Sequence, residues 1–323
     1  MMKSCLIWLN LISSTFKYQD YHDECVIAAF GSIDIEPILN GTADTFFIEA
    51  RKHLAGFCIA GVQAKHTLAI QKQDDKQHLT ISNQNSDYIF KPCPAHYQNL
   101  DSNEHLSQEI MRVLGFNVPG CGILKFEDSS TAYFIKRYDR LGNGTKLHQE
   151  DMLAAMGIPN TNENIKYQGS YEAVAKLLKK FGSANLTAEF IKRIISAYLL
   201  GNGDFHLKNI SIIYSENGIE LSPVYDFVNT HMYGDTDLLC LDLLIDEPEV
   251  ESFEDFYCLQ KKDFVALSDR VEVPADVINE FIENNIVNNL DKIFALIQCS
   301  SLDDKQKKDY LSLVSERIGH LTI

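Results

Sequence analysis

The fold is decided by the stretch Gly201-Asn202-Gly203-Asp204-Phe205-His206-Leu207-Lys208-Asn209, which an apolar, strand-like segment follows. The chain then reaches Pro223-Val224-Tyr225-Asp226-Phe227, where we expect a strand over residues 222–225 that ends at Asp226. Asp204 and Asn209 lie five residues apart. Two carboxylates and an amide that converge on one place are costly unless a divalent cation neutralises them. The stretch therefore predicts a metal-dependent site built from consecutive loops.

This trio of side chains suits phosphoryl transfer from ATP. One carboxylate accepts or orients the proton of the attacking hydroxyl, an amide oxygen holds metal, and a second carboxylate bridges the metal to the phosphates. The D-x4-N spacing of Asp204 and Asn209 matches the catalytic loop of protein kinases, and Asp226 stands where their metal-binding aspartate comes next. The alternative is an Asx-rich turn leading into an ordinary hairpin. The flanking strand signals and the second aspartate favour phosphoryl transfer.

The composition is that of an ordinary globular protein. The chain has 323 residues, enough for two lobes with separate cores, and is 45% hydrophobic and 23% charged. Its formal net charge of −16 argues against direct binding of nucleic acid, because a phosphate backbone would be repelled by most of the surface.

The cysteines and the first residues indicate the cellular compartment. Eight cysteines are scattered without a tight framework, which in a chain of this size is typical of free thiols in a reducing compartment. The apolar segment 5–12 is too short to span a bilayer and lacks the small-residue cleavage site of a signal peptide. We therefore expect a cytoplasmic protein without membrane contact; a secreted effector is the alternative.

Cys5, His22 and Cys25 resemble part of a small metal-binding knuckle. A four-coordinate structural zinc would need a further ligand near position 8, where this chain has Trp8. The sequence therefore favours a buried pair of thiols with a packed histidine over a zinc site.

A small, flexible segment precedes the first predicted strand of the N-terminal part. Residues 56–65 read Gly-Phe-Cys-Ile-Ala-Gly-Val-Gln-Ala-Lys, and residues 67–70 alternate like a strand. A glycine-containing loop that runs into a strand lets backbone amides approach phosphate oxygens, and Lys65 adds positive charge. A hairpin bend is the alternative, because the segment has neither a G-x-G-x-x-G nor a Walker pattern.

Lys91 stands near the end of an apolar strand expected over residues 87–92. A lysine on such a strand should not point inward without a partner. In a kinase-like lobe it would pair with the nucleotide phosphates, whereas a solvated edge lysine is the alternative. Glu104 and Glu109, on an amphipathic helix expected over residues 104–114, are its candidate partners.

The spacing of apolar residues in the rest of the chain predicts a β-rich first part and a helical second part. Further strands are expected over residues 123–126 and 132–138, with a linker over 139–144. Helices are expected over residues 149–157, 170–181, 187–200, 261–271, 275–299 and 303–321. We therefore predict an α+β fold with a small β-rich N-terminal lobe over residues 1–140, which carries the phosphate loop and the nucleotide-binding sheet. The mainly helical C-terminal lobe, over residues 141–323, would carry the catalytic loop and the metal site.

Six motifs in one order resemble the HipA-like serine/threonine kinases of bacterial toxin–antitoxin systems. They occupy residues 61–65, 88–92, 136–140, 148–151, 202–209 and 223–226. The likeness covers residues 5–226, and the direct passage from a Cys/His stretch to the phosphate loop is similar to the short HipT form. The resemblance implies a two-lobed protein-kinase-like fold related to the phosphoinositide-3-kinase-like group.

By motif position, the resemblance also implies the roles of individual residues, with ATP and Mg²⁺ as cofactors. Asp204 would be the catalytic base, and Asn209 and Asp226 would hold Mg²⁺. His206 would be a structural hydrogen-bonding residue beneath the loop, and Lys208 would face the transferred phosphoryl group.

The same resemblance places the nucleotide contacts in the N-terminal lobe. Lys91 would contact the ATP phosphates beside Lys65. The phosphates would be covered by the backbone of Cys58, Ile59, Ala60, Gly61, Val62 and Gln63. Residues 135–138, which include Lys136 and Tyr138, would form the hinge against adenine through backbone hydrogen bonds.

Members of this family modify a serine of an aminoacyl-tRNA synthetase, which stalls translation and arrests growth. The resemblance therefore implies a protein substrate of that class and HipB-like or HipS-like antitoxin partners. The phosphate loop departs from the family pattern: Cys58 and Ala60 replace the serines that are usually autophosphorylated, and neither takes a stable phosphoester. Restraint by a partner protein, or an alteration of the sequence at these positions, is expected instead.

Two other classes of function stay open. One is a lipid or small-molecule kinase on the same fold, acting as an effector in a host. The other is a pseudokinase that binds nucleotide without chemistry. The pseudokinase would be expected to lack Lys91, Asp204, Asn209 or Asp226, and all four are present.

Overall fold

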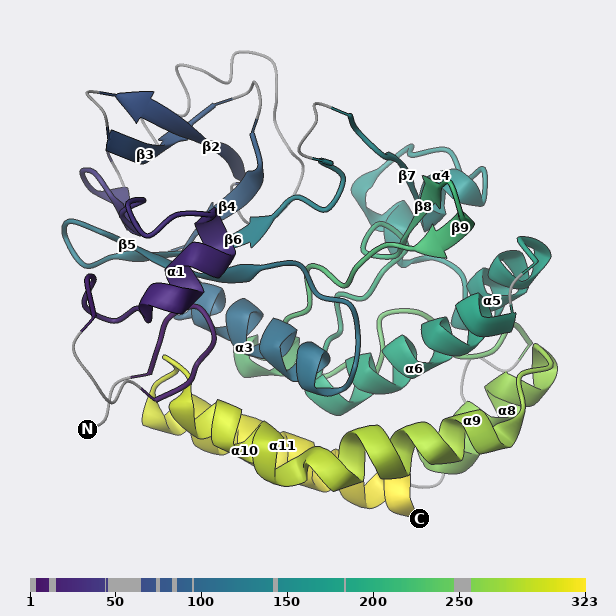
Figure 1. Ribbon diagram of the computed structural model, residues 1–323. Coiled ribbons are helices and arrows are strands. Elements are labelled where there is room, and N and C mark those ends of the chain that lie inside the picture. Colours follow the sequence, from purple (N-terminus) through teal and green to yellow (C-terminus); the bar gives the residue numbers. More distant parts are fainter. Residues whose placement is uncertain are drawn as a thin grey trace. The chain divides into compact units, whose positions relative to one another are not determined.

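The structure is a computed structural model of the chain (Figure 1). It describes residues 4–11, 16–43, 45, 65–73, 76–82, 86–94, 96–141, 145–182, 184–246 and 257–323. The predicted phosphate-loop residues 58–63 lie outside this described part. None of the helices within it is long and apolar enough to cross a membrane.

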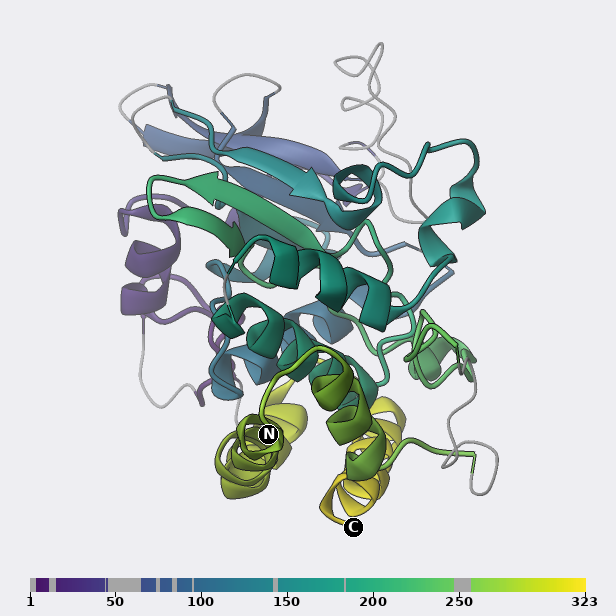
Figure 2. The same cartoon turned by 90° about the vertical axis from the view of Figure 1, so that its right-hand side faces the viewer.

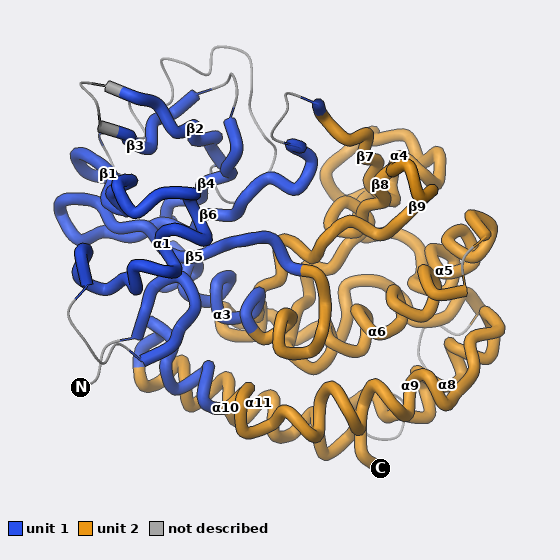
Figure 3. The backbone as a smooth tube through the Cα atoms, viewed as in Figure 1, with its two compact units in different colours: residues 1–109, 118–145, 295–303 blue, residues 110–117, 146–294, 304–323 orange. Residues whose placement is uncertain are grey.

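The chain divides into two compact units (Figure 3). Unit 1 comprises residues 1–109, 118–145 and 295–303, and unit 2 comprises residues 110–117, 146–294 and 304–323. Two helices, α3 (Leu100–Val113) and α10 (Leu290–Cys299), contribute residues to both units. The lobe boundary after residue 140 stays a prediction.

Unit 1 is built on a six-stranded sheet with the strand order β1-β5-β6-β4-β2-β3. All neighbouring strands are antiparallel except β1 and β5. The strands are β1 (Ile38–Leu39), β2 (His66–Gln73), β3 (Lys76–Ile81), β4 (Tyr88–Pro92), β5 (Cys121–Phe126) and β6 (Thr131–Lys136). The sequence does not predict β3, because this edge strand carries polar residues at most positions.

Among the described residues, α1 (Asp23–Phe30) and α3 lie on opposite faces of the large sheet at β4. Successive side chains of β4 point to opposite faces. Tyr88 and Phe90 share the face covered by α1, where the Tyr88 hydroxyl donates a hydrogen bond to the Ala29 carbonyl (2.9 Å) and its ring contacts Phe30. Lys91 points to the other face, toward α3. Tyr88 and Phe90 therefore pack on the α1 side of β4, and the buried charge of Lys91 lies on the α3 side.

Unit 2 combines a three-stranded antiparallel sheet, in the order β7-β8-β9, with most of the helices. The strands are β7 (His148–Asp151), β8 (Ser211–Ser215) and β9 (Gly218–Leu221). The α-helices are α4 (Met152–Ala155), α5 (Tyr171–Lys180), α6 (Ala184–Leu200), α8 (Lys261–Arg270), α9 (Ala275–Glu280) and α11 (Asp304–Thr322). Short 3-10 helices span Glu163–Tyr167, Thr230–Tyr233 and Val287–Asn289, and a π-helical turn spans Phe281–Ile286.

Helix α6 is the central element of unit 2. Twelve of its seventeen residues are buried, and it packs against α5, α8, α9, α11 and β9. The β8–β9 hairpin lies above the teal helices α5 and α6 in Figure 1 and in the turned view of Figure 2, and β9 contacts α6. The helix is therefore enclosed by the rest of unit 2, and it delivers the chain to Gly201 from a rigid position.

Two of the predicted helices are wrong in detail. Residues 149–151, predicted to be helical, belong to strand β7, because their backbone pairs with β8 and the Asp151 carboxylate caps α4 through the Ala154 amide (2.8 Å). The single helix predicted over residues 275–299 is interrupted at Phe281–Ile286 by a π-helical turn, which apolar periodicity does not reveal.

Candidate active site

The chain leaves α6 through a sharp turn at Gly201. Its φ of +71° lies in the left-handed region, and a Cβ at this position would lie 2.6 Å from Leu313 Cδ2. The next residue, Asn202, is fully buried, and its Oδ1 accepts a hydrogen bond from the Asp204 amide (3.0 Å). The start of the loop is thus fixed by backbone geometry and by a side chain that holds the Asp204 backbone.

Gly203 is required for a different reason. A Cβ there would lie 2.0 Å from Asp235 Oδ2, whereas the Gly203 amide donates a hydrogen bond to Thr230 Oγ1 (2.8 Å). The Thr230 hydroxyl also donates to Asp235 Oδ2. The segment at residues 230–235 therefore packs directly on the loop backbone, and no side chain fits between them.

The Asp204 side chain is 44% exposed, so its carboxylate is accessible to a substrate hydroxyl. One oxygen, Oδ1, accepts a hydrogen bond from the Tyr167 hydroxyl (2.9 Å) and lies 3.5 Å from His206 Nε2. These contacts fix the orientation of the carboxylate without covering it. A carboxylate that is oriented and still open to solvent suits a general base.

His206 lies beneath the loop and is 3% exposed. Burial lowers the pKa of its imidazole to about 4, against the opposing influence of the Asp204 and Asp226 carboxylates. The ring also contacts Tyr167 edge-on, with 5.1 Å between centroids. A neutral, buried imidazole is suited to supporting the loop from below, and the structural role expected from the sequence stays a prediction.

The buried neutral state of His206 predicts a pH dependence of stability. The pKa of His206 is about 4 in the folded protein, below the usual value of 6.5. Between pH 4 and pH 6.5 the unfolded chain therefore binds a proton more readily than the folded protein does. The stability present above pH 6.5 is therefore lost as the pH falls toward 4. Between pH 7 and pH 5 we expect wild type to lose about 2 kcal/mol more than His206→Gln in urea unfolding. Equal losses in both proteins would contradict the assignment.

Asn209 closes the loop back onto its start. The amide nitrogen Nδ2 donates a hydrogen bond to the Asp204 carbonyl (2.7 Å), and the Asn209 backbone amide donates to the His206 carbonyl (2.8 Å). Because the side-chain nitrogen is used in this way, the amide oxygen is the atom that can bind a cation.

Asp226 lies in an extended segment, not at the end of a strand. The predicted strand over residues 222–225 is wrong: β9 ends at Leu221, and the Val224 amide donates instead to the Asn117 carbonyl (2.8 Å). Asp226 has a φ of +55°, which is uncommon for a residue other than glycine. Its carboxylate contributes to the electrostatic environment of His206, as does that of Asp204. Both carboxylates thus influence one buried histidine, and the Asp204 carboxylate lies 3.5 Å from its Nε2.

The far end of the loop is braced by Tyr225. Its hydroxyl donates a hydrogen bond to the Lys208 carbonyl (3.1 Å) and lies 2.6 Å from Ser211 Oγ. The Lys208 side chain is only half-buried. The hydrogen bond from Tyr225 fixes the backbone at Lys208. The position of the ammonium group then depends on the conformation of the Lys208 side chain.

Lys91, in unit 1, forms a buried ion pair with Glu104 of α3. The Lys91 ammonium donates a hydrogen bond to Glu104 Oε1, and the two residues are 3% and 1% exposed. Lys91 also lies over the Tyr133 ring, 5.5 Å from its centroid. These contacts exclude the solvated edge lysine and select Glu104 over Glu109, which instead accepts a hydrogen bond from the Cys121 thiol (3.7 Å).

The other predicted nucleotide-binding residues lie at the ends of strands. Lys65 directly precedes β2 and is half-buried. Lys136 ends β6, and its amide donates to the Gly120 carbonyl (2.7 Å). The neighbouring Arg137 amide donates to the Asp87 carbonyl (2.7 Å). Adenine binding along residues 135–138 would therefore have to use groups other than these two amides, such as carbonyl oxygens or the backbone of Tyr138.

Several residues that shape the site carry no local sequence signal. Tyr167, which orients Asp204, lies 37 positions before it, and Thr230 and Asp235 reach the loop from a later segment. The sequence indicates these residues only through Gly203, because a glycine beside a catalytic motif indicates that another segment approaches closely.

The family model described as HipA-like C-terminal domain matches residues 57–292. The chain belongs to this family. A Haemophilus influenzae protein called "Putative kinase" is 31% identical over 342 residues, which cover 100% of this chain and 98% of the relative. The HipA-like kinase family that the sequence motifs indicate is therefore confirmed, whereas the short HipT form stays a prediction.

HipA itself is similar in sequence and in structure. The "Serine/threonine-protein kinase toxin HipA" of Shewanella oneidensis is 24% identical over 160 residues, which cover 43% of this chain and 36% of the toxin. The solved complex of Shewanella oneidensis HipA with HipB and operator DNA matches with a TM-score of 0.61 and 23% identity, covering 82% of this chain and 65% of that one. This likeness confirms the predicted α+β, kinase-like fold.

Proposed function

We propose that this HipA-like protein is an ATP-dependent serine/threonine protein kinase of a toxin–antitoxin system. The observation that best supports the proposal is the loop from Asp204 to Asn209. It combines an oriented, solvent-accessible carboxylate with an amide oxygen suited to a cation. Phosphoryl transfer to a hydroxyl requires both of these groups, one to accept the proton and one to bind the metal.

In this proposal each loop residue has one role. Asp204 accepts the proton of the substrate hydroxyl, and Tyr167 holds its carboxylate in place. His206 stays neutral and supports the loop from within the core. Lys208 directs its ammonium group toward the transferred phosphoryl group, where positive charge stabilises the oxygens of the transition state.

The donor set fits Mg²⁺ with ATP. Asn209 and Asp226 would hold the metal through an amide oxygen and a carboxylate, the hard oxygen ligands that Mg²⁺ prefers. Bound Mg²⁺ supplies neutralisation of the phosphate charges. Lys91, oriented by Glu104, would contact the nucleotide phosphates as the sheet lysine of protein kinases does. Lys65, residues 58–63 and the backbone at Lys136 and Tyr138 would complete the nucleotide site.

The proposed substrate is a serine of an aminoacyl-tRNA synthetase, whose modification would arrest translation and growth. The proposed partners are HipB-like and HipS-like antitoxin proteins, and the proposed location is the cytoplasm. The support is membership of the HipA-like family and the similarity to a toxin solved with HipB. With Cys58 and Ala60 in the phosphate loop, restraint would come from a partner rather than from autophosphorylation.

The purified protein, γ-labelled ATP and whole-cell lysate test this function. We expect label on a serine of one protein in the size range of aminoacyl-tRNA synthetases, with Mg²⁺ required and with no label when Asp204→Asn replaces wild type. Identification of the labelled protein by mass spectrometry then names the substrate. Label confined to a lipid fraction would favour the lipid-kinase alternative. Absence of label with every acceptor, while ATP still binds, would favour a pseudokinase.

A further inference from the structure

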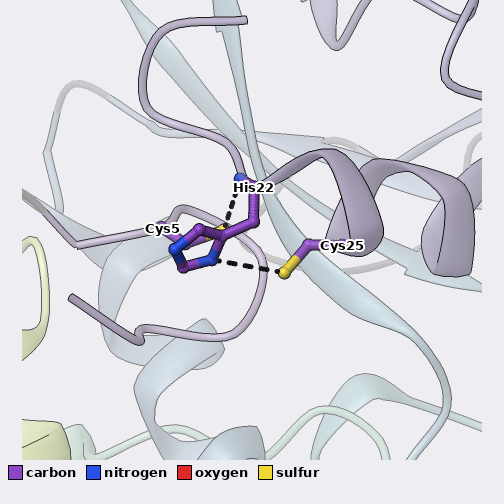
Figure 4. A group of neighbouring side chains, drawn as sticks. All are labelled: Cys5, His22 and Cys25. Atoms are coloured by element: carbon purple, nitrogen blue, oxygen red, sulfur yellow. Dashed lines mark hydrogen bonds between the residues drawn. The ribbon is translucent and has the colours of Figure 1, made fainter. Parts of the chain in front are cut away.

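Cys5, His22 and Cys25 form a buried cluster at the start of unit 1, apart from the residues that the proposed function uses (Figure 4). Both cysteines are fully buried and His22 is 8% exposed. One potential ligand atom from each residue lies within 4.8 Å of the other two. The burial and packing expected from the sequence are present, and the three side chains also converge on one point.

The distances suit ligands of a single tetrahedral ion. With Zn–S bonds of about 2.3 Å and Zn–N bonds of about 2.1 Å, a sulfur and a nitrogen on one zinc lie about 3.6 Å apart, and two sulfurs about 3.8 Å apart. His22 Nδ1 lies 3.5 Å from Cys25 Sγ. The three ligand atoms lie within 4.8 Å of one another, so shifts of about 1 Å would bring the remaining pairs to these separations.

The backbone is arranged to hold Cys5 as a thiolate. Its Sγ accepts a hydrogen bond from the His22 amide (3.4 Å) and lies within reach of the Ile7 and Trp8 amides. A tight turn holds these amides in place, with the Cys5 amide donating to the Asn10 carbonyl (2.8 Å). Several N–H groups aimed at one sulfur favour the charged form, which is the form that binds metals.

The cluster joins two segments that are both docked on strand β5. The Leu6 carbonyl accepts from the Ile123 amide (2.8 Å), and the Tyr21 hydroxyl donates to the Ile123 carbonyl (3.1 Å). Asp20 forms an ion pair with Lys125 (2.6 Å). His22 and Cys25 are then held together by the start of α1, three positions apart. The three side chains are therefore preorganised by contacts that do not depend on a metal.

We propose that Cys5, His22 and Cys25 bind one Zn²⁺ as a site that ties the N-terminal segment to α1. Cys5 binds as the thiolate and the Cys25 thiol gives up its proton to solvent on binding, so two thiolates and one divalent cation make a neutral unit that can be buried. Zn²⁺ fits because mixed cysteine and histidine ligands suit it. Trp8 stands where a fourth protein ligand would be expected, so the fourth position is left for water.

The test uses the full-length protein, prepared under reducing conditions and loaded with Co²⁺ as a spectroscopic substitute for Zn²⁺. We expect one equivalent of cobalt with a thiolate-to-metal charge-transfer band that one equivalent of Zn²⁺ abolishes. The single tryptophan, Trp8, lies three residues after Cys5, so its fluorescence should be quenched in step with the band. Cobalt that binds without a thiolate band, as on the acidic surface, would overturn the proposal.

Variants then assign the ligands. Cys5→Ser and Cys25→Ser should each weaken zinc binding by at least about 100-fold, because each removes a direct ligand. The matched control is Cys93→Ser, which alters a half-buried cysteine of the same unit outside the cluster and should bind zinc like wild type. Zinc binding that is equal in Cys5→Ser and wild type would overturn the proposal. So would a Cys5–Cys25 disulfide that persists in the reduced, zinc-supplied protein, and this measurement needs no variant.

Discussion

Asp204→Asn is expected to lower the rate of phosphoryl transfer by about 100- to 10,000-fold, the usual contribution of a general base, and to leave stability unchanged. Asparagine has the shape of aspartate and can still accept the hydrogen bond from the Tyr167 hydroxyl. It cannot accept a proton from the substrate. The loss should therefore appear in kcat, measured with γ-labelled ATP and a protein acceptor, at unchanged urea midpoint.

The matched control is Glu216→Gln, which removes the same charge from an exposed residue of the β8–β9 turn in the same unit. Its rate should equal that of wild type. Comparable losses in both variants would mean that general electrostatics, and not a base, explains the effect. Wild-type turnover of purified Asp204→Asn would contradict the proposed role outright.

Asp226→Asn separates metal binding from proton transfer. Asparagine tolerates the left-handed backbone at this position, so the fold should be kept. With one carboxylate ligand lost, we expect a rate decrease that added Mg²⁺ partly restores. No such rescue is expected for Asp204→Asn, because that carboxylate is assigned to the proton. Identical Mg²⁺ dependence in the two variants would contradict this division.

The arrangement of the loop from Asp204 to Asn209 could be predicted from sequence because its polar groups lie close together in the chain, whereas its catalytic role stays a prediction. Four residues separate Asp204 from Asn209, and hydrogen bonds within the loop set their relative positions. The side chain that orients Asp204 could not be predicted, since Tyr167 comes from a separate 3-10 helix. The spacing of residues within one loop can be read directly from the sequence, whereas a contact between distant segments depends on the packing of the whole unit.

The partner of Lys91 illustrates the same limit. Glu104 and Glu109 both lie on α3, five residues apart, and so on different sides of the helix. Both are buried, and only the packing of α3 on β4 decides that Glu104 meets the lysine while Glu109 meets Cys121. The sequence could therefore predict that Lys91 needs a partner, but it left two candidates.

Glu104→Gln is expected to lower the free energy of unfolding by about 3–5 kcal/mol, because it leaves the Lys91 ammonium buried without a counter-charge. Fluorescence of Trp8, which belongs to unit 1 like the ion pair, reports this loss in urea. The control is Asp309→Asn, which removes one partner of an exposed ion pair with Lys305 and should cost less than about 1 kcal/mol. A similarly small cost for Glu104→Gln would show that the pair is not buried in solution.

The double variant Lys91→Met/Glu104→Leu distinguishes the structural role of the pair from its proposed role in nucleotide binding. Removing both charges together leaves no unpaired ion, so most of the lost stability should return. Phosphoryl transfer should not return, because the nucleotide phosphates would lack their lysine. A double variant that regains both stability and activity would limit the ion pair to a structural role. One that regains stability alone would place Lys91 among the groups that bind ATP.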